Sequence, residues 1–155
     1  MKEKNVVYNV AEVKSFSPEG CENSYSSRLL VDRENVGSKL MVMNEFTLKA
    51  GKQTYKGNHG KGFDEIYFVL SGKALFYLQE MGTGDYKEYN LYQGSYAFIK
   101  GGWGHYMTNP YDEDVILLTI MAKHPYKGVN LLYDERKTKW GTSFRLKNPE
   151  EERME

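Results

Sequence analysis

Apolar and polar side chains alternate along the middle of the chain. From residue 40 to residue 48, one face carries Leu40, Val42, Phe46 and Leu48, and the other carries Met41, Met43, Glu45 and Thr47. A period of two is typical of a β-strand with one buried face, and Ala50-Gly51 ends this segment. Further segments are predicted as strands: Glu65–Leu70, Ala74–Glu80, Tyr86–Leu91, Ser95–Ile99 and Asp114–Ala122.

Turn signals separate these predicted strands. They are polar or rich in glycine: Ser71-Gly72-Lys73, Met81–Asp85, Gln93-Gly94, Lys100–Gly104 and Asn109–Asp112. Short strands spaced by about 8 to 12 residues, with turns between them, indicate a β-sandwich or a β-barrel. We therefore predict an all-β fold. Helical periodicity is weak and confined to Pro125–Asp134.

One domain is expected, because no repeat and no low-complexity linker divides the 155 residues. We divide the chain into an N-terminal extension with edge strands over 1–37, a barrel over 38–124, and a C-terminal extension with a charged tail over 125–155. Within the first part, Asn5–Val10 is predicted as an edge strand and Ser15–Ser27 as a loop.

Composition narrows the class of protein. The 21 basic residues balance the 21 acidic ones, so no net field draws in nucleic acid or an anionic membrane. No apolar run approaches the roughly 20 residues that span a bilayer, and the N-terminus does not resemble a signal peptide. The single cysteine, Cys21, fits a reducing compartment, so we expect a cytoplasmic protein. The 13 Tyr and 7 Phe agree with half-buried strands.

Candidate chemistry centres on the histidines, of which the chain has three. His59 precedes the predicted strand of Glu65, and positions 59, 61, 63, 65 and 67 share one face if that stretch is extended throughout. His105 follows a glycine-rich turn. Two imidazoles and a carboxylate on one face can hold a divalent metal and leave a position open for substrate. His124 has no such context and is expected at the surface.

The segments around these residues resemble the two motifs of the cupin superfamily, G-x5-H-x-H-x3–4-E-x6-G and G-x5-P-x-G-x2-H-x3-N. The second motif matches with every spacing kept, apart from Lys100 in place of its proline, at Gly94, Gly102, His105 and Asn109. The first motif matches at His59, Glu65 and Gly72, with Lys61 in place of its second histidine. The resemblance implies a double-stranded β-helix, the jelly-roll barrel of cupins, with short N- and C-terminal extensions.

The register of the first motif has two solutions. With His59 as the first histidine, the spacing to Glu65 is kept, but the stretch from Gly51 is two residues too long. With His59 as the second histidine, Gly57 replaces the first and the gap to Glu65 is too long. We favour the former, because it places His59 and Glu65 on one face.

By this resemblance, His59, Glu65 and His105 are metal ligands for iron, manganese, nickel or zinc. Lys61 leaves open two alternatives: a metal-free pocket in which Lys61 pairs with Glu65, and a structural vestige. Glu65, Lys61 and Tyr67 are the candidate catalytic residues. Substrate-binding roles are assigned to Lys56, Trp103, Tyr106 and Tyr96.

Two long segments, residues 55–79 and 103–135, are similar to cupin-type sugar isomerases. The resemblance implies a metal-dependent enzyme that acts on a small polar substrate, and specifically isomerisation of a sugar or sugar phosphate. Alternatives are another metal-dependent cupin enzyme, an oxygenase or lyase acting on a small acid, and a non-catalytic cupin that binds a sugar or small ligand. Cupins commonly form homodimers, and residues 1–37 are the candidate segment for exchange between subunits.

Overall fold

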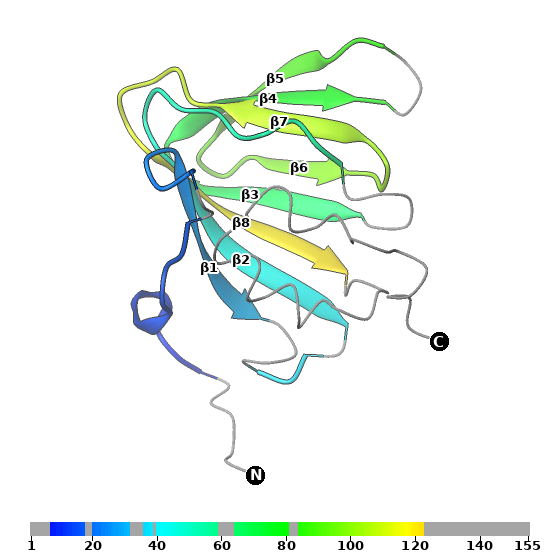
Figure 1. Cartoon of the computed structure of the whole chain (residues 1–155). Coiled ribbons are helices and arrows are strands. Elements are labelled where there is room, and N and C mark those ends of the chain that lie inside the picture. Colours follow the sequence, from blue (N-terminus) through cyan, green and yellow to red (C-terminus); the bar gives the residue numbers. More distant parts are fainter. Residues whose placement is uncertain are drawn as a thin grey trace.

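Antiparallel strands make up nearly all of the regular secondary structure that the computed structural model describes (Figure 1). The structure describes residues 7–17, 20–31, 36–38, 40–58, 64–80 and 84–122. Its elements are η1 (Val10–Glu12), β1 (Tyr25–Val31), β2 (Met41–Leu48), β3 (Glu65–Ser71), β4 (Lys73–Gln79), β5 (Lys87–Tyr92), β6 (Tyr96–Ile99), β7 (Gly104–Thr108) and β8 (Val115–Ala122). The predicted all-β fold is confirmed. Within these ranges, no helix is long and apolar enough to cross a membrane.

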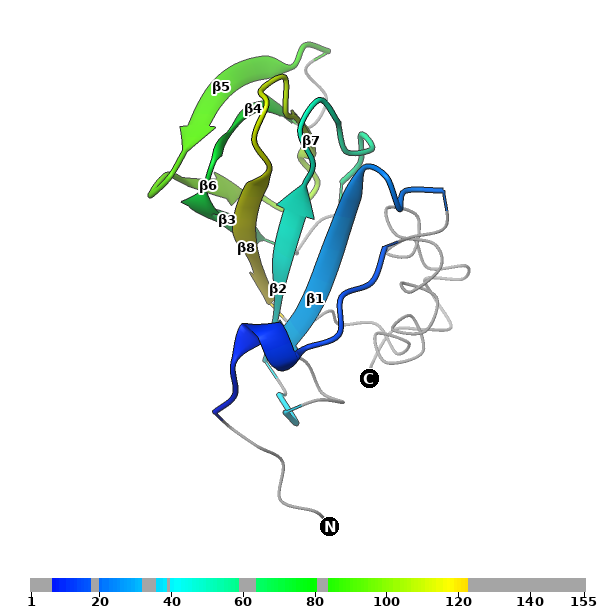
Figure 2. The same ribbon diagram turned by 90° about the vertical axis from the view of Figure 1, so that its left-hand side faces the viewer.

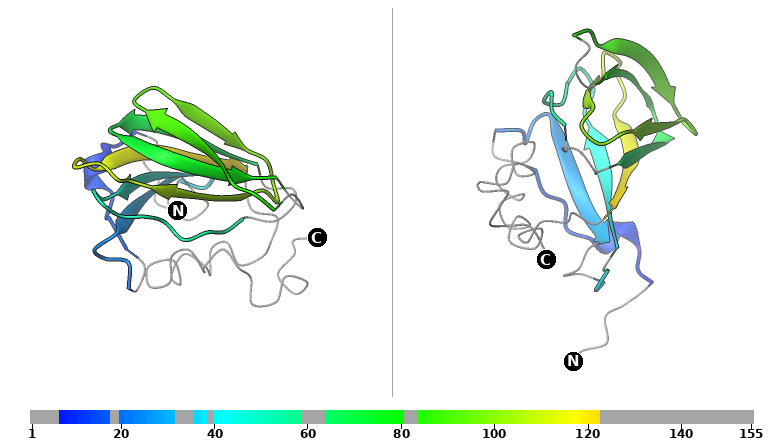
Figure 3. Two further views of the ribbon diagram at one scale, coloured as in Figure 1. Left: turned by 90° about the horizontal axis from the view of Figure 1, so that it is seen from above. Right: turned by 90° about the vertical axis from the view of Figure 1, so that its right-hand side faces the viewer.

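The strands form two sheets. A five-stranded sheet has the order β1-β2-β8-β3-β6, and a three-stranded sheet has the order β5-β4-β7. Figure 2 shows the smaller sheet at the β6 end of the larger one, and the view from above in Figure 3 shows the two as layers. Because β2 and β3 both pair with β8, strands far apart in sequence lie side by side.

One apolar core joins the two sheets. Its main cluster of buried residues includes side chains from all the strands, among them Phe46 of β2, Val69 of β3, Phe76 of β4 and Met107 of β7. Alternate residues of each strand point inward, as the period of two requires. In β2 the inward residues are Val42, Asn44, Phe46 and Leu48.

Gly72 links the two sheets at the turn between β3 and β4. Its φ is +77°, and a Cβ built there would lie 2.4 Å from the carbonyl oxygen of Asp114. Only glycine avoids both the left-handed strain and this backbone clash. The glycine that closes the first motif is therefore required by the turn.

The N-terminal part differs from the prediction. Strand β1 begins at Tyr25, inside the predicted loop Ser15–Ser27, and pairs with β2 along its length. The predicted strand over Asn5–Val10 is wrong where the structure describes it, because residues 7–9 are not in a strand and a short 3-10 helix begins at Val10. Asn9 and Glu12 cap that helix reciprocally, and such a capping box favours helix initiation over a strand.

The structure also contains β7, although no strand was predicted between the turns Lys100–Gly104 and Asn109–Asp112. The predicted helix Pro125–Asp134, His124 and the charged tail lie outside the described residues.

Candidate metal site in the barrel

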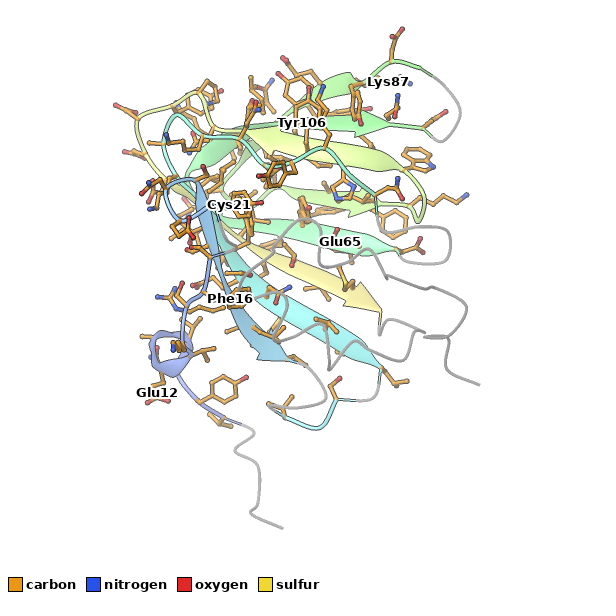
Figure 4. The ribbon with its side chains drawn as sticks, in the orientation of Figure 1. Glu12, Phe16, Cys21, Glu65, Lys87 and Tyr106 are labelled. Carbon is orange, nitrogen blue, oxygen red and sulfur yellow. The ribbon has the colours of Figure 1, made fainter. Side chains whose placement is uncertain are left out.

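A buried carboxylate and a buried imidazole face each other inside the barrel. Glu65 is the first residue of β3, and His105 lies in β7 of the other sheet. Their side chains are 3 % and 8 % exposed, and Oε2 of Glu65 lies 3.6 Å from Nε2 of His105. Figure 4 labels Glu65 at β3. The structure thus brings together two of the three predicted metal ligands.

The backbone orients the His105 ring. Its Nδ1 lies 3.2 Å from the carbonyl oxygen of Trp103. A carbonyl oxygen only accepts, so Nδ1 carries the proton and donates this hydrogen bond. In the neutral ring, Nε2 then presents its lone pair toward Glu65. Metal-binding histidines are commonly oriented in this way by a hydrogen bond at their other nitrogen.

The donor set of the pair suits a divalent cation. Imidazole nitrogen and carboxylate oxygen are both ligands of borderline metals, at about 2.0 to 2.2 Å. Two such ligands on one ion lie roughly 3 to 4 Å apart, and Oε2 and Nε2 are separated by 3.6 Å. Among the described residues there is no group of three metal-ligating side chains. Of the three predicted ligands, the structure therefore describes Glu65 and His105.

His59 and Lys61 lie outside the described residues, and the described residues before and after them contact His105 and the turn that precedes β7. Gly57 forms an isolated bridge with His105, with its nitrogen 3.2 Å from the His105 oxygen and its oxygen 2.8 Å from the His105 nitrogen. On the other side, the Asp64 carboxylate accepts a hydrogen bond of 3.0 Å from Gly101. The roles of His59 and Lys61 remain predictions.

Tyr67 lies on the same face of β3 as Glu65. Its ring centroid is 5.9 Å from that of His105, with the planes at 80°. Burial raises the pKa of the Tyr67 phenol well above its usual value, and the negative charge of Glu65 raises it further. The Tyr67 phenol therefore stays protonated well into the alkaline range.

The inner wall beside Tyr67 carries a polar pair that sequence reasoning missed. Thr119 is the register partner of both Tyr67 and Asn44. The Asn44 side chain is buried, and its Nδ2 donates a hydrogen bond of 3.2 Å to the Thr119 hydroxyl. The sequence contains one signal for this pair, because Asn44 is the polar residue among the otherwise apolar inward positions of β2.

Solved structures of the same architecture are found among known proteins. A predicted oxalate decarboxylase from Thermotoga maritima superposes with a TM-score of 0.63 at 18% identity, covering 76% of this chain and 98% of that one. A sugar phosphate isomerase of the cupin superfamily from Silicibacter pomeroyi gives 0.63 at 17% identity, covering 77% and 76%. The chain has the cupin fold.

A third structure is the Bacillus subtilis oxalate decarboxylase, a protein with Mn(II) centres. It has a TM-score of 0.62 and 20% identity, and the match covers 73% of this chain but only 28% of that longer one. No family model matches the chain, and no curated protein matches it either. At these identities the likeness establishes the cupin fold and not an activity.

Not all of the other predicted site residues lie beside Glu65 and His105. Trp103 is half-buried, packs on the main core cluster and orients His105 through its carbonyl. Tyr96 is 72% exposed on the outer side of β6. Tyr106 follows His105 in β7 and so lies on the opposite face of that strand. Figure 4 shows it at the small sheet, apart from Glu65 on β3.

Lys56 lies with Tyr106 on this outer side of the cupin barrel. Its Nζ is 4.8 Å from the ring centroid of Tyr106 and 5.4 Å from that of Tyr86. Tyr77 stacks on Tyr106 at 4.5 Å and 4°. Cation–π contacts of this kind hold an ammonium group in place. Lys56 thus packs the segment before Gly57 against β7. Its side chain contacts these tyrosines and not Glu65 or His105.

Asn109, the last residue of the second cupin motif, organises a turn. Its buried Nδ2 donates to the carbonyl oxygens of Leu48 at 3.2 Å and Glu113 at 2.8 Å, and its Oδ1 accepts from the Tyr111 nitrogen. All these partners are structural, so the asparagine holds the connection between β7 and β8. The second motif therefore contains one candidate site residue, His105, and residues that shape turns, such as Asn109.

Proposed function

We propose that this chain is a metal-dependent enzyme that isomerises a small polar substrate of the sugar or sugar phosphate class. The observation that carries the proposal is the buried pair of Glu65 and His105, whose ligand atoms lie 3.6 Å apart. The fold supports it by analogy, since a sugar phosphate isomerase and a protein with Mn(II) centres are both similar to the chain in structure.

In this proposal Glu65 and His105 hold the cation, together with His59. When bound, the cation polarises a substrate carbonyl and stabilises negative charge on its oxygen. The Trp103 carbonyl keeps the His105 ring in the orientation that offers Nε2. Burial of both side chains excludes water from the pair and strengthens every electrostatic interaction there.

Isomerisation needs a base and a hydrogen-bond donor. The base takes a proton from one substrate carbon and returns it to the neighbouring carbon, while the hydroxyl proton of the first carbon moves to the former carbonyl oxygen, so the reaction balances without an oxidant or reductant. We assign this role to Glu65, with Lys61 as the second candidate. Tyr67, whose buried phenol stays protonated, donates a hydrogen bond to a substrate oxygen. The Asn44–Thr119 pair offers polar groups beside the same wall.

Metal content and affinity test the site. We expect the purified chain to bind manganese, iron, nickel or zinc at about one ion per chain, measured by elemental analysis and titration calorimetry. Glu65→Gln and His105→Asn should each weaken binding at least roughly 100-fold. Glu88→Gln is the matched control, because Glu88 is exposed on β5 and accepts a hydrogen bond from Tyr77. Equal affinities in the wild type and both site variants would remove the metal site.

Turnover tests the reaction. In deuterated water with aldose and ketose phosphates, NMR should detect the interconverted sugar and deuterium at the carbon that exchanges its proton. A chelator should abolish the rate and a divalent metal should restore it. Full activity after complete metal removal contradicts the proposal. Tight sugar binding without any turnover identifies a non-catalytic binding protein instead.

A second candidate is a lyase that decarboxylates a small acid. Two of the similar structures are oxalate decarboxylases, one of them predicted, and this favours the alternative over an oxygenase. Release of carbon dioxide and formate from oxalate by the metal-loaded chain would establish it. Oxygen consumption with iron(II) would instead identify an oxygenase.

A further inference from the structure

The inner face of the five-stranded sheet carries a polar pair among apolar neighbours. Asn44 of β2 and Thr119 of β8 are direct register partners, and the two residues are 1% and 5% exposed. Figure 2 shows β2, β8 and β3 side by side in this sheet. The residues two positions before and after the pair in these strands are buried and apolar: Val42, Phe46, Leu117 and Met121. A polar pair in such surroundings costs stability unless its hydrogen-bonding groups are satisfied.

The hydrogen bond within the pair leaves part of its capacity unused. Nδ2 of Asn44 donates to the Thr119 hydroxyl oxygen at 3.2 Å. Within the part of the chain that the structure describes, Oδ1 of Asn44 is buried and has no hydrogen-bond partner. The Thr119 hydroxyl still has its own proton to donate. The pair therefore presents both an acceptor and a donor.

This result does not depend on which way the Asn44 amide is turned. After a turn of 180°, Oδ1 would accept from the Thr119 hydroxyl, Nδ2 would become the free donor, and the hydroxyl oxygen would become the free acceptor. In both orientations the pair offers a donor and an acceptor at adjacent positions.

The pair lies close to the candidate metal ligands. Tyr67 is the register partner of Thr119 on β3, and its ring contacts the His105 ring. Glu65 lies two residues before Tyr67, so it is a diagonal neighbour of Thr119, and such neighbours are about 7 to 8 Å apart. The carbon chain of a small sugar is long enough to lie between them.

We propose that Asn44 and Thr119 form a hydroxyl-binding subsite, which takes a sugar hydroxyl of a ligand whose other end lies at Glu65 and His105. A hydroxyl both donates and accepts, so it satisfies both free groups of the pair. A carboxylate or a phosphate dianion only accepts, and an ammonium group only donates. Each of these would leave one buried group of the pair unpaired. The subsite therefore selects the neutral, hydroxyl-bearing part of the ligand.

This subsite deepens the proposed function and rests on it for the class of ligand, a sugar or sugar phosphate. It disfavours oxalate, whose two carboxylates have no proton to donate at neutral pH. The subsite contains no metal ligand, so its selectivity for a hydroxyl needs no bound cation. Its competing occupant is a structural water, which also donates and accepts.

Matched ligands test the proposal. Titration calorimetry of the full chain, with manganese and again with a chelator, measures the affinity for the D-pentonates and for pentose and hexose phosphates. The mono-deoxy forms of the tightest ligand should include one that binds at least about 10-fold more weakly, because it leaves the buried pair unsatisfied. We call this ratio of affinities the hydroxyl selectivity.

Substitutions assign the hydroxyl selectivity to the pair. The double variant Asn44→Leu, Thr119→Val removes both polar groups together, so the ligand and its deoxy form should bind within about 2-fold of each other. Thr119→Val alone should lower the selectivity at least about 3-fold, so the test does not depend on the folding of the double variant. Thr119→Ser retains the hydroxyl and should retain the selectivity. Thr47→Val is the matched control, because Thr47 lies on the outer face of β2.

Near-UV circular dichroism and urea denaturation check the fold of each variant. If the pair only holds a structural water, the hydroxyl selectivity will persist in the double variant, and this result overturns the proposal. Absence of binding by every ligand tested, or equal binding of all deoxy forms, overturns it as well. Loss of metal dependence and turnover with the selectivity retained contradicts only the proposed function, and the subsite stands.

Discussion

The two edges of the five-stranded sheet distribute polar and apolar side chains in opposite ways. At the β1–β2 edge, Phe46 is buried and the outer face carries an ion pair between Arg28 and Glu45, with 2.6 Å between Nη1 and Oε1. At the β3–β6 edge, the carboxylate of Glu65 is buried and Phe98 is 55% exposed. Phe46, Arg28 and Glu45 follow the rule for a half-buried sheet, whereas Glu65 and Phe98 depart from it, one on each face.

Both the buried carboxylate and the exposed aromatic side chain are unfavourable for an isolated folded chain. A buried charge loses its hydration, and an exposed aromatic face favours association. The β1–β2 edge thus contributes to stability, whereas the β3–β6 edge carries the candidate site on its inner face and exposed aromatic side chains on its outer face. The predictions below test this division, starting with the largest effect.

Truncating a phenylalanine should show the difference most strongly. Phe46→Ala should lower the free energy of unfolding by about 3 to 5 kcal/mol, because it leaves a cavity in the core. Phe98→Ala, measured by urea denaturation where the chain is monomeric, should change it by less than about 1 kcal/mol. Equal losses would mean that Phe98 belongs to the monomer's core.

The turn from β3 to β4 should be more sensitive than other glycine turns. Gly72→Ala should lower the free energy of unfolding by more than about 2 kcal/mol, since left-handed strain and a backbone clash add. Gly94→Ala is the control, because Gly94 has a φ of +84° but nothing within 4 Å of its Cβ position. Its loss should be limited to about 1 kcal/mol. A smaller effect at Gly72 would contradict the close approach to Asp114.

Alkaline pH should destabilise the chain through its buried tyrosines. Burial is the main cause that raises the pKa of Tyr25 above its ordinary value of 10.0. The folded state therefore keeps a proton that the unfolded state loses, so this contribution to stability is present below pH 10 and decreases above it. One unit above that pH, Tyr25 should account for about 1.4 kcal/mol.

The measurement is the free energy of unfolding at pH 8 and pH 11 for the wild type and Tyr25→Phe, in which the decrease should be smaller. Tyr67→Phe should reduce the decrease as well. Since Glu65 contributes to the raised pKa of Tyr67 but not to that of Tyr25, Glu65→Gln should weaken only the Tyr67 effect.

Substituting the two carboxylates of the sheet, Glu45 and Glu65, should change stability least. The two substitutions should affect different properties of the chain. Glu45→Gln should lower stability by about 0.5 to 1 kcal/mol at most, because its ion pair with Arg28 is partly exposed. Glu65→Gln should leave the stability of the metal-free chain equal or higher, since an amide is less costly to bury than a carboxylate. Its loss should appear in metal affinity. A large destabilisation without metal would make Glu65 a structural residue.

Much of the fold was predictable because strand periodicity is local. The strands β2 to β6 and β8 lie within one or two residues of their predicted bounds. Strand β7 was missed because its five residues lie between two turns. Had it been recognised, alternation would have separated Tyr106 from His105 and argued against a shared site. Strand β1 was missed because its polar serines resemble a loop, and its pairing with β2 decides the structure.

By itself the sequence determined the all-β class, the turn glycines and the residues Glu65 and His105 as a pair to consider, since alternation and motif spacing depend on neighbouring residues only. Tertiary structure decided which strands are adjacent and which face of each strand is inside, because strand pairing is non-local. It brought Glu65 and His105 together from two sheets, placed Lys56 and Tyr96 outside, and left an aromatic face on the back of β3 and β6.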